Sequence, residues 1–197
     1  MSKTFSTERI CAFTDGVYAI VITLLVLELK APEVPGMSDE QLLVDLAKQS
    51  TSFLAYFISF FVIGLLWFRH HGIFKALEKS NNIVIFINFI HLLFVSLLPY
   101  TASLAGRYEQ DQLAVLMFFG NIAISGVTVS LLKQYVLPKK EWQKQELFEQ
   151  LIGERWQHRL TLSVGPVLAI LVSFYDSQVA LWVFLVLIPP LALLIWR

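Results

Sequence analysis

The residues best placed to do chemistry are polar side chains inside long apolar stretches of the sequence. Asp15 lies in the first apolar run, six residues after Arg9. A charge near the centre of a membrane helix costs at least ~2.5 kcal/mol, so such a residue faces the interior of a helix bundle and has partners. Asp15 and Arg9 therefore indicate either a polar network that shapes an ion path or a structural link between helices, and both interpretations stay open.

A second pattern lies on one face of the same run. Ile20, Thr23 and Leu27 follow one another at helical spacing, which places all three on one side of a helix. Four copies around an axis would form a ring of Ile20, a ring of Thr23 hydroxyl groups and a ring of Leu27. The spacing by itself favours ordinary helix packing, because apolar stripes of this kind are common.

Two adjacent histidines follow Trp67 near the end of the second apolar run. His70 and His71 point about 100° apart on a helix, so they form a poor bidentate metal pair. A membrane-embedded enzyme that uses them and Asp15 with a metal ranks last, because no helix shows His-Glu-x-x-His spacing. A pH-sensing role is open, since histidine titrates near neutral pH, but a structural role is favoured.

Other polar side chains in the apolar runs are expected to join helices. His91 is interpreted as a neutral, hydrogen-bonded residue between helices, with a proton relay as the alternative. Asn88 and Asn121 are expected to make interhelical hydrogen bonds. Glu28, at the outer end of the first run, either concentrates cations at a pore mouth, pairs with Lys30 or remains in water.

The composition identifies the solvent that this chain faces. Of its 197 residues 56% are hydrophobic and 15% are charged, against about 25% charged in a typical soluble domain. The excess apolar surface indicates a lipid bilayer. Lys+Arg and Asp+Glu are equal at 15 each, which argues against nucleic acid as a partner. A single cysteine, Cys11, excludes an internal disulfide, and no cofactor or resident metal site is recognisable.

The elements that position these residues are six apolar segments. A spanning helix needs roughly 20 mostly apolar residues, and six segments approach this length. We therefore predict an all-α membrane protein with a single six-helix transmembrane domain over residues 1–197. A break or kink is expected near the end of the last span, at Pro189 and Pro190. The spans are residues 9–29, 50–68, 83–105, 112–132, 160–175 and 177–196.

Lysine and arginine residues set the expected orientation. If the chain has six spans, only three basic residues fall on one side of the membrane: Lys30, Lys48 and Arg107. The other side is therefore predicted to be cytoplasmic and to hold both termini. It collects Lys3, Arg9, Arg69, Lys75, Lys79, Lys133, Lys139, Lys140, Lys144, Arg155, Arg159 and Arg197.

Two connections between the spans have helical patterns. Ser38 and Gln41 form a capping-box pattern at the start of an external helix over residues 38–48. In the cytoplasmic connection over residues 139–157, Phe148, Ile152 and Trp156 recur every fourth residue. This pattern suits either an interfacial helix or a solvated connector.

The start of the first span resembles a known family signature. Arg9 through Phe13-Thr14-Asp15 is similar to the Arg-x-x-x-Phe-Ser-Asp motif of the transmembrane protein 175 family of potassium channels, with Thr14 where serine is usual. The resemblance is specific in the first span, moderate through the third and faint beyond Tyr100, so it covers about half of the chain. The other matching positions are residues 16–28, Trp67, His70, His71, Asn88 and Leu98-Pro99.

This resemblance implies a function and an assembly. Prokaryotic members with one six-helix unit form homotetramers in which the first helix lines the pore. The resemblance therefore implies a modestly selective, potassium-permeable channel of the cell membrane. Ile20 would form the apolar constriction of its pore, followed toward the outside by Thr23 and then Leu27. The signature residues would hold this helix against the second helix. The competing hypothesis is a secondary transporter or proton-coupled carrier that uses Asp15, His91 and Arg9.

Overall fold

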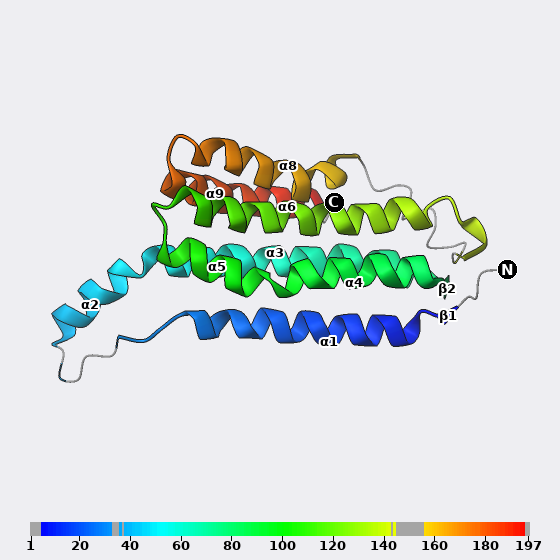
Figure 1. Ribbon diagram of the computed structural model, residues 1–197, viewed down its shortest axis with the longest axis horizontal. Coiled ribbons are helices and arrows are strands. Elements are labelled where there is room, and N and C mark those ends of the chain that lie inside the picture. The colour runs from blue at the N-terminus through cyan, green and yellow to red at the C-terminus, as the bar shows by residue number, and fades with distance from the viewer. Residues whose placement is uncertain (1–4, 33–35, 37, 143, 145–155, 196–197) are drawn as a thin grey trace.

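The computed structural model describes residues 5–32, 36, 38–142, 144 and 156–195, and it is helical almost throughout (Figure 1). In the described part of the chain, the longest elements are helices of 17 to 26 residues. In chain order the elements are β1 (Phe5–Ser6), α1 (Glu8–Leu24), η1 (Leu25–Glu28), α2 (Asp39–Lys48), α3 (Ser50–Lys75), β2 (Lys79–Ser80), α4 (Asn82–Ser96), α5 (Leu98–Arg107), α6 (Gln112–Val136), η2 (Lys140–Trp142), α8 (Trp156–Ser173) and α9 (Ser177–Ile195).

The helices form a bundle with α1 at its edge. Figure 1 shows α1 along one side, α3, α4 and α5 in the middle, and α6, α8 and α9 on the far side. The core lies between the middle and far helices, where Ile58, Leu66, Phe118 and Leu132 are completely buried. Because α1 packs only against the middle helices, one of its faces stays uncovered by the rest of the chain.

Within the described residues, four helical segments are long and apolar enough to cross a membrane. They are Glu8–Glu28, Ser50–Lys75, Asn82–Arg107 and Gln112–Val136. The protein is therefore an all-helical, multi-pass membrane protein. The two last predicted spans coincide with the helices α8 and α9, while a total of six crossings stays a prediction.

Several predicted boundaries were wrong, for identifiable reasons. The helix that contains the second predicted span, residues 50–68, continues to Lys75, because Ile73 and Phe74 are buried in the core beyond the polar residues 69–71. The third span is two helices that meet at Leu97. Pro99 is tolerated there because the first turn of α5 needs no intrahelical N–H bond from it. The helix α9 continues through Pro189 and Pro190 to Ile195, so the expected break is absent from the described chain.

A small sheet fixes the start of α1. Phe5 and Ser6 pair antiparallel with Ser80 and Lys79. The buried Thr7 adds a hydrogen bond from its hydroxyl to the carbonyl oxygen of Leu77, at 3.0 Å. The N-terminus of α1 is therefore tied to the connection between α3 and α4.

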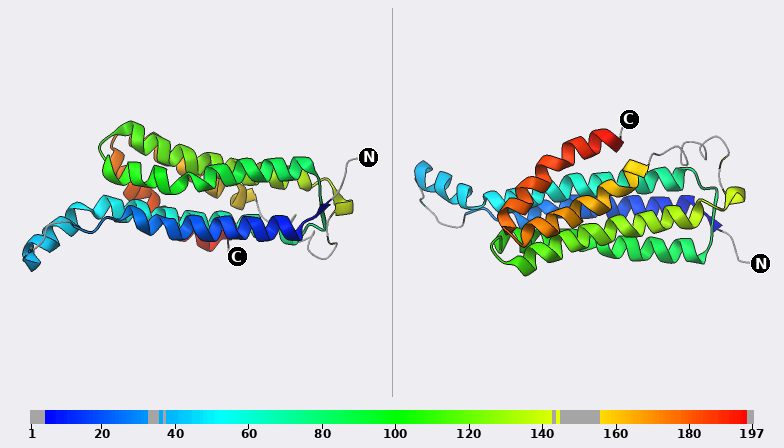
Figure 2. Two further views of the ribbon diagram at one scale, coloured as in Figure 1. Left: turned by 60° about the horizontal axis from the view of Figure 1, so that its bottom comes forward. Right: turned by 90° about the horizontal axis from the view of Figure 1, so that it is seen from above.

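The connection between the first two predicted spans forms the predicted capped helix. Ser38 Oγ accepts a hydrogen bond from the Gln41 backbone N–H, and Gln41 Oε1 accepts one from the Ser38 backbone N–H, which confirms the capping box. This helix, α2, extends beyond the end of the bundle in both views of Figure 2. The predicted cytoplasmic helix around Phe148 and Ile152 lies outside the described residues.

Candidate pore helix and its polar anchor

Thr14 anchors α1 to the bundle through a buried chain of hydrogen bonds. Its hydroxyl oxygen accepts a bond from Asn88 Nδ2 on α4, at 2.9 Å. The amide oxygen of Asn88 lies 2.7 Å from Nε2 of His70 on α3. Because that oxygen only accepts, Nε2 of His70 carries the proton and donates. All three side chains are at most 2% exposed, so this chain joins α1, α4 and α3 inside the bundle.

A second buried chain, centred on His91, joins α1 to α6. Nε2 of His91 lies 2.6 Å from the hydroxyl oxygen of Tyr18, and Nδ1 lies 2.8 Å from Oγ1 of Thr128. The Thr128 hydroxyl donates to the carbonyl oxygen of Ser125, so it accepts from Nδ1 of His91. Nε2 then accepts a hydrogen bond from the Tyr18 hydroxyl. A neutral imidazole with its proton on Nδ1 makes both of these hydrogen bonds. His91 thus makes the interhelical hydrogen bonds expected from the sequence.

The two chains lie side by side. The rings of His70 and His91 stack with their centroids 5.6 Å apart and their planes within 6°. Four helices are therefore joined through one polar layer in an otherwise apolar core. Since an unsatisfied buried donor or acceptor costs about 1–3 kcal/mol, this layer favours a single position of α1 against its neighbours.

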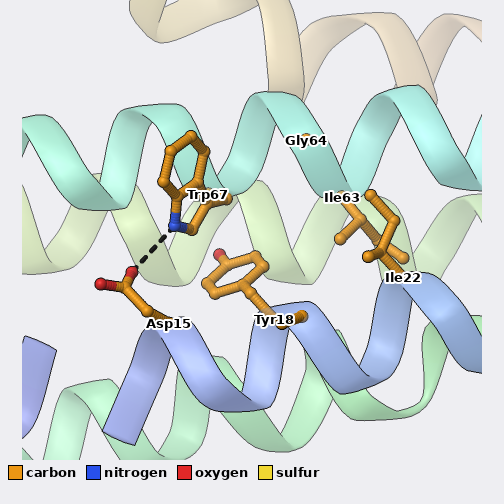
Figure 3. Close-up of a pocket in the computed structure, with 7 residues that line it drawn as sticks. Asp15, Tyr18, Ile22, Ile63, Gly64 and Trp67 are labelled. Carbon is orange, nitrogen blue, oxygen red and sulfur yellow. Dashed lines mark hydrogen bonds between the residues drawn. The ribbon is translucent and has the colours of Figure 1, made fainter. Parts of the chain in front are cut away.

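Asp15 sits at the edge of this layer and contacts Trp67. The indole Nε1 of Trp67 donates to Oδ1 of Asp15 at 2.8 Å, as the dashed line in Figure 3 shows. His71 packs against the Trp67 ring with a centroid distance of 5.3 Å. The adjacent histidines therefore contact different residues, His70 contacting Asn88 and His71 contacting Trp67. Arg9 is exposed and, within the described residues, forms no ion pair with Asp15.

The opposite face of α1 is uncovered. Ile20 and Leu27 are each 60% exposed, meaning that the rest of this chain does not cover them, and Thr23 is exposed between them. The Thr23 hydroxyl donates back to the carbonyl oxygens of Ile20 and Ala19, at 2.8 and 3.0 Å. Its hydrogen is therefore engaged within the helix, and its oxygen presents lone pairs outward.

The outer end of α1 differs from expectation in two respects. The last turn, η1, is a 3₁₀ helix, so the regular α-helical spacing assumed for Leu27 ends at Leu24. Glu28 pairs with Arg107 of α5, at 3.6 Å between the charged groups, rather than with Lys30. Both charged groups are partly exposed, so this ion pair contributes little to stability.

Sequence reasoning missed Tyr18 and Thr128 as members of the polar layer. A signal for Tyr18 was present. Thr14 and Tyr18 are four residues apart on α1, and Asn88 and His91 are three residues apart on α4, so two polar pairs at helical spacing face each other. Thr128 lies in a run with several small hydroxyl residues, and no spacing singles it out.

The fold and this site define a class of protein: a multi-pass helical membrane protein whose first helix is held by a polar layer on one face and uncovered on the other. Comparisons with known proteins identify the family. A family model described as the endosomal/lysosomal potassium channel TMEM175 matches residues 9–99. A protein of Chryseobacterium sp. (strain P1-3) named as a potassium channel is 30% identical over 174 residues, which cover 88% of this chain and 85% of that protein.

Two further comparisons extend this result. A crystal structure described as a lysosomal potassium-selective channel TMEM175 homologue from Chamaesiphon minutus matches with a TM-score of 0.77 and 27% identity, covering 95% of this chain and 96% of that one. The mouse protein named endosomal/lysosomal proton channel TMEM175 is 38% identical over 145 residues. The matched part covers 66% of this chain, but only 29% of the mouse protein's length.

This chain belongs to the TMEM175 family of potassium channels. The resemblance seen in the sequence is thereby confirmed. The family is one of ion channels, not enzymes, which removes the membrane-embedded enzyme from the hypotheses. The secondary transporter is not favoured by any of these relatives.

Proposed function

We propose that this protein is a homotetrameric, potassium-permeable cation channel of the cell membrane, with α1 lining a central pore. The observation that carries the proposal is the uncovered face of α1, where Ile20 and Leu27 are each 60% exposed on either side of Thr23. The buried polar layer holds the other face, so this side of α1 is available to line a path between four copies. Potassium is proposed as the permeant ion because relatives of this chain are named as potassium channels.

The constriction is a ring of four Ile20 side chains. A narrow apolar neck excludes water and gates by dewetting, so a passing cation sheds part of its hydration shell. Potassium holds its water less tightly than sodium and crosses at lower cost, which gives modest selectivity. The Thr23 oxygens, with their lone pairs facing outward, then replace part of the lost water, and Leu27 and Glu28 stand further toward the outer mouth. No cofactor takes part, and potassium is the permeant ion.

Both termini are cytoplasmic in this proposal. In Figure 1, α9 runs back toward the end of the bundle at which α1 begins. That end carries exposed Arg9, Lys75, Lys79 and Lys140, whereas α2 and its single Lys48 project from the opposite end. The positive-inside rule therefore places the end where α1 begins in the cytoplasm and α2 outside.

The test is Ile20→Asn in purified channels reconstituted into planar bilayers. Asn replaces the apolar neck with a polar one, so the dehydration cost falls, and we expect the current to rise and the potassium-to-sodium permeability ratio to approach one. Leu131→Asn is the matched control, because Leu131 is an exposed apolar residue on α6, away from α1. An unchanged ratio in Ile20→Asn with intact currents would remove Ile20 as the filter.

The same recordings also show which ion carries the current. In a potassium gradient at equal pH, the reversal potential is expected to follow potassium. Some relatives are named proton channels, so the measurement is repeated in a pH gradient at equal potassium. A reversal potential that follows the pH gradient alone would contradict the potassium pathway, and absence of unitary steps would favour an alternating-access carrier.

A further inference from the structure

A cavity of about 340 Å³ lies between α1 and α3, on one flank of the uncovered α1 face (Figure 3). Ile22 and Ile63 close one end, and Asp15 with Trp67 stands at the other. The cavity exists partly because Gly64 has no side chain, since a Cβ placed there would meet no atom within 4 Å. The walls are mainly apolar, and among the described residues that line them Asp15 alone is charged.

Two protruding aromatic rings lie where the exposed face of α1 meets α4. Phe13 of α1 and Phe89 of α4 lie with their ring centroids 5.8 Å apart and their planes tilted by 56°. They are 52% and 53% exposed, so about half of each side chain projects from the subunit. Phe89 lies on the α4 side of α1 and the cavity lies on the α3 side, while Phe13, seven residues before Ile20, stands at the α4 edge of the Ile20 face.

Closed rotational symmetry brings these two flanks together. When α1 faces the central axis of a tetramer, each subunit presents one flank to the preceding copy and the other flank to the next. Such an interface is heterologous, so it joins two different surfaces and closes into a ring. The surface beside the cavity of one copy must therefore meet the surface beside Phe13 and Phe89 of its neighbour.

We propose that the Phe13–Phe89 pair of one subunit fills the α1–α3 cavity of the next subunit. This inference rests on the tetramer in the proposed function and assigns its interface. An apolar cavity of about 150 Å³ holds one benzene ring, so 340 Å³ accommodates two rings. Buried aromatic anchors seated in pockets dominate interface energies.

The position of Asp15 fits the same occupant. Its Oδ1 accepts from Trp67, while Oδ2 has no hydrogen-bond partner among the described residues. The edge of an aromatic ring carries partial positive charge. A ring that enters the cavity with its edge toward Asp15 therefore meets the carboxylate favourably. The interface then covers the two flanks of α1 and the Phe13 end of its exposed face, and it leaves Ile20 and Thr23 to the pore.

Disulfide trapping tests this contact directly. In a Cys11→Ser background, one chain carries Phe89→Cys and a differently tagged chain carries Gly64→Cys, and both are expressed together. Mild oxidation in membranes is expected to give a covalent dimer that contains both tags. The matched control replaces Gly64→Cys by Gly72→Cys, because Gly72 lies two turns further along α3, has open space around it and does not line the cavity. This pair is expected to give no dimer.

A second variant tests the cavity without cysteine chemistry. Gly64→Leu fills the space within the subunit, and we expect the concentration for half-assembly to rise about tenfold or more, as for loss of a buried anchor. Gly72→Leu is the control and should assemble normally.

The outcomes separate this contact from the function. Normal tetramers and potassium currents with no mixed dimer, or unaffected assembly in Gly64→Leu, overturn the contact and leave the channel standing. Lipid chains found in the cavity of an intact tetramer would likewise overturn the contact and leave the channel standing. A chain that stays monomeric and passes no current overturns both.

Discussion

Thr23 is the residue at which a small chemical change should most directly alter ion passage. Its hydroxyl hydrogen is held by the backbone, so only the oxygen lone pairs face outward. Thr23→Val keeps the shape and removes this oxygen. If the oxygen replaces about 1 kcal/mol of lost hydration, potassium conductance should fall about fivefold in single-channel recordings.

The control for this prediction keeps the hydroxyl. Thr23→Ser retains the oxygen and its hydrogen bond to the backbone, and it should conduct nearly as the natural protein does. Equal conductance in Thr23→Val and Thr23→Ser would show that the oxygen plays no part in passage.

Tyr18 should contribute measurably to stability through His91. Tyr18→Phe leaves Nε2 of the buried His91 without its partner, and an unsatisfied buried group costs about 1–3 kcal/mol. Thermal unfolding of the detergent-solubilised protein should show a correspondingly lower midpoint. Tyr100→Phe, at an exposed position on α5, should unfold normally. Equal midpoints for both variants would mean that the Tyr18 hydroxyl contributes nothing to the fold.

Much of the polar layer was predictable at the level of single residues, but its pairing was not. Asn88 and His91 were recognisable because each is polar within an apolar run, where lipid cannot satisfy it, whereas Thr14 and His70 were recognisable through the family signature. Which partner each one meets depends on the rotation of α1 against α4, which no local pattern specifies. Glu28 shows this clearly, since its partner Arg107 is far away in sequence while Lys30 is near.

At the scale of elements, the helices α3 and α5 approach each other closely at Gly106. A Cβ built on Gly106 would lie 2.8 Å from the Cα of Ser52, which is backbone and cannot move aside cheaply. Gly106→Ala is therefore expected to destabilise the protein by about 1–3 kcal/mol, the usual cost of overpacking. Chemical or thermal unfolding measures this change.

A matched glycine should give the opposite sign. Gly120 of α6 has open space around its Cα, so alanine there removes the helix penalty of glycine and should stabilise by about 0.5–1 kcal/mol. If both variants behaved alike, the helices α3 and α5 would not be in close contact at Gly106.

Apolar length predicted where the helices lie, but not where they end. A helix continues while its backbone bonds are satisfied, so α3 runs seven residues past the predicted end at Phe68, through His70 and His71 to Lys75. The end of α1 changes to a 3₁₀ turn within an unbroken apolar run, and nothing in its composition marks the change. By contrast, the cap at Ser38 was predictable, because a capping box depends only on residues three apart.

At the scale of the whole molecule, the two ends of the bundle differ in chemistry. The paired strands, the start of α1 and η2 gather at one end, where Thr7 and the β1–β2 pair tie the N-terminal segment down. At the other end, α2 extends away from the bundle and none of its residues is buried. We therefore expect the basic residues to select one direction of insertion into the bilayer.

This direction can be measured with one pair of matched substitutions. In a Cys11→Ser background, Glu40→Cys lies on α2 and Glu78→Cys lies in the connection after α3, and both positions are exposed. A membrane-impermeant maleimide applied to intact cells should label Glu40→Cys at once, because α2 is placed outside. Glu78→Cys should react only after the cells are opened, because the proposed orientation places the basic end of the bundle in the cytoplasm. The reverse labelling pattern would show that the protein has the opposite orientation in the membrane, with α2 and Glu28 on the cytoplasmic side.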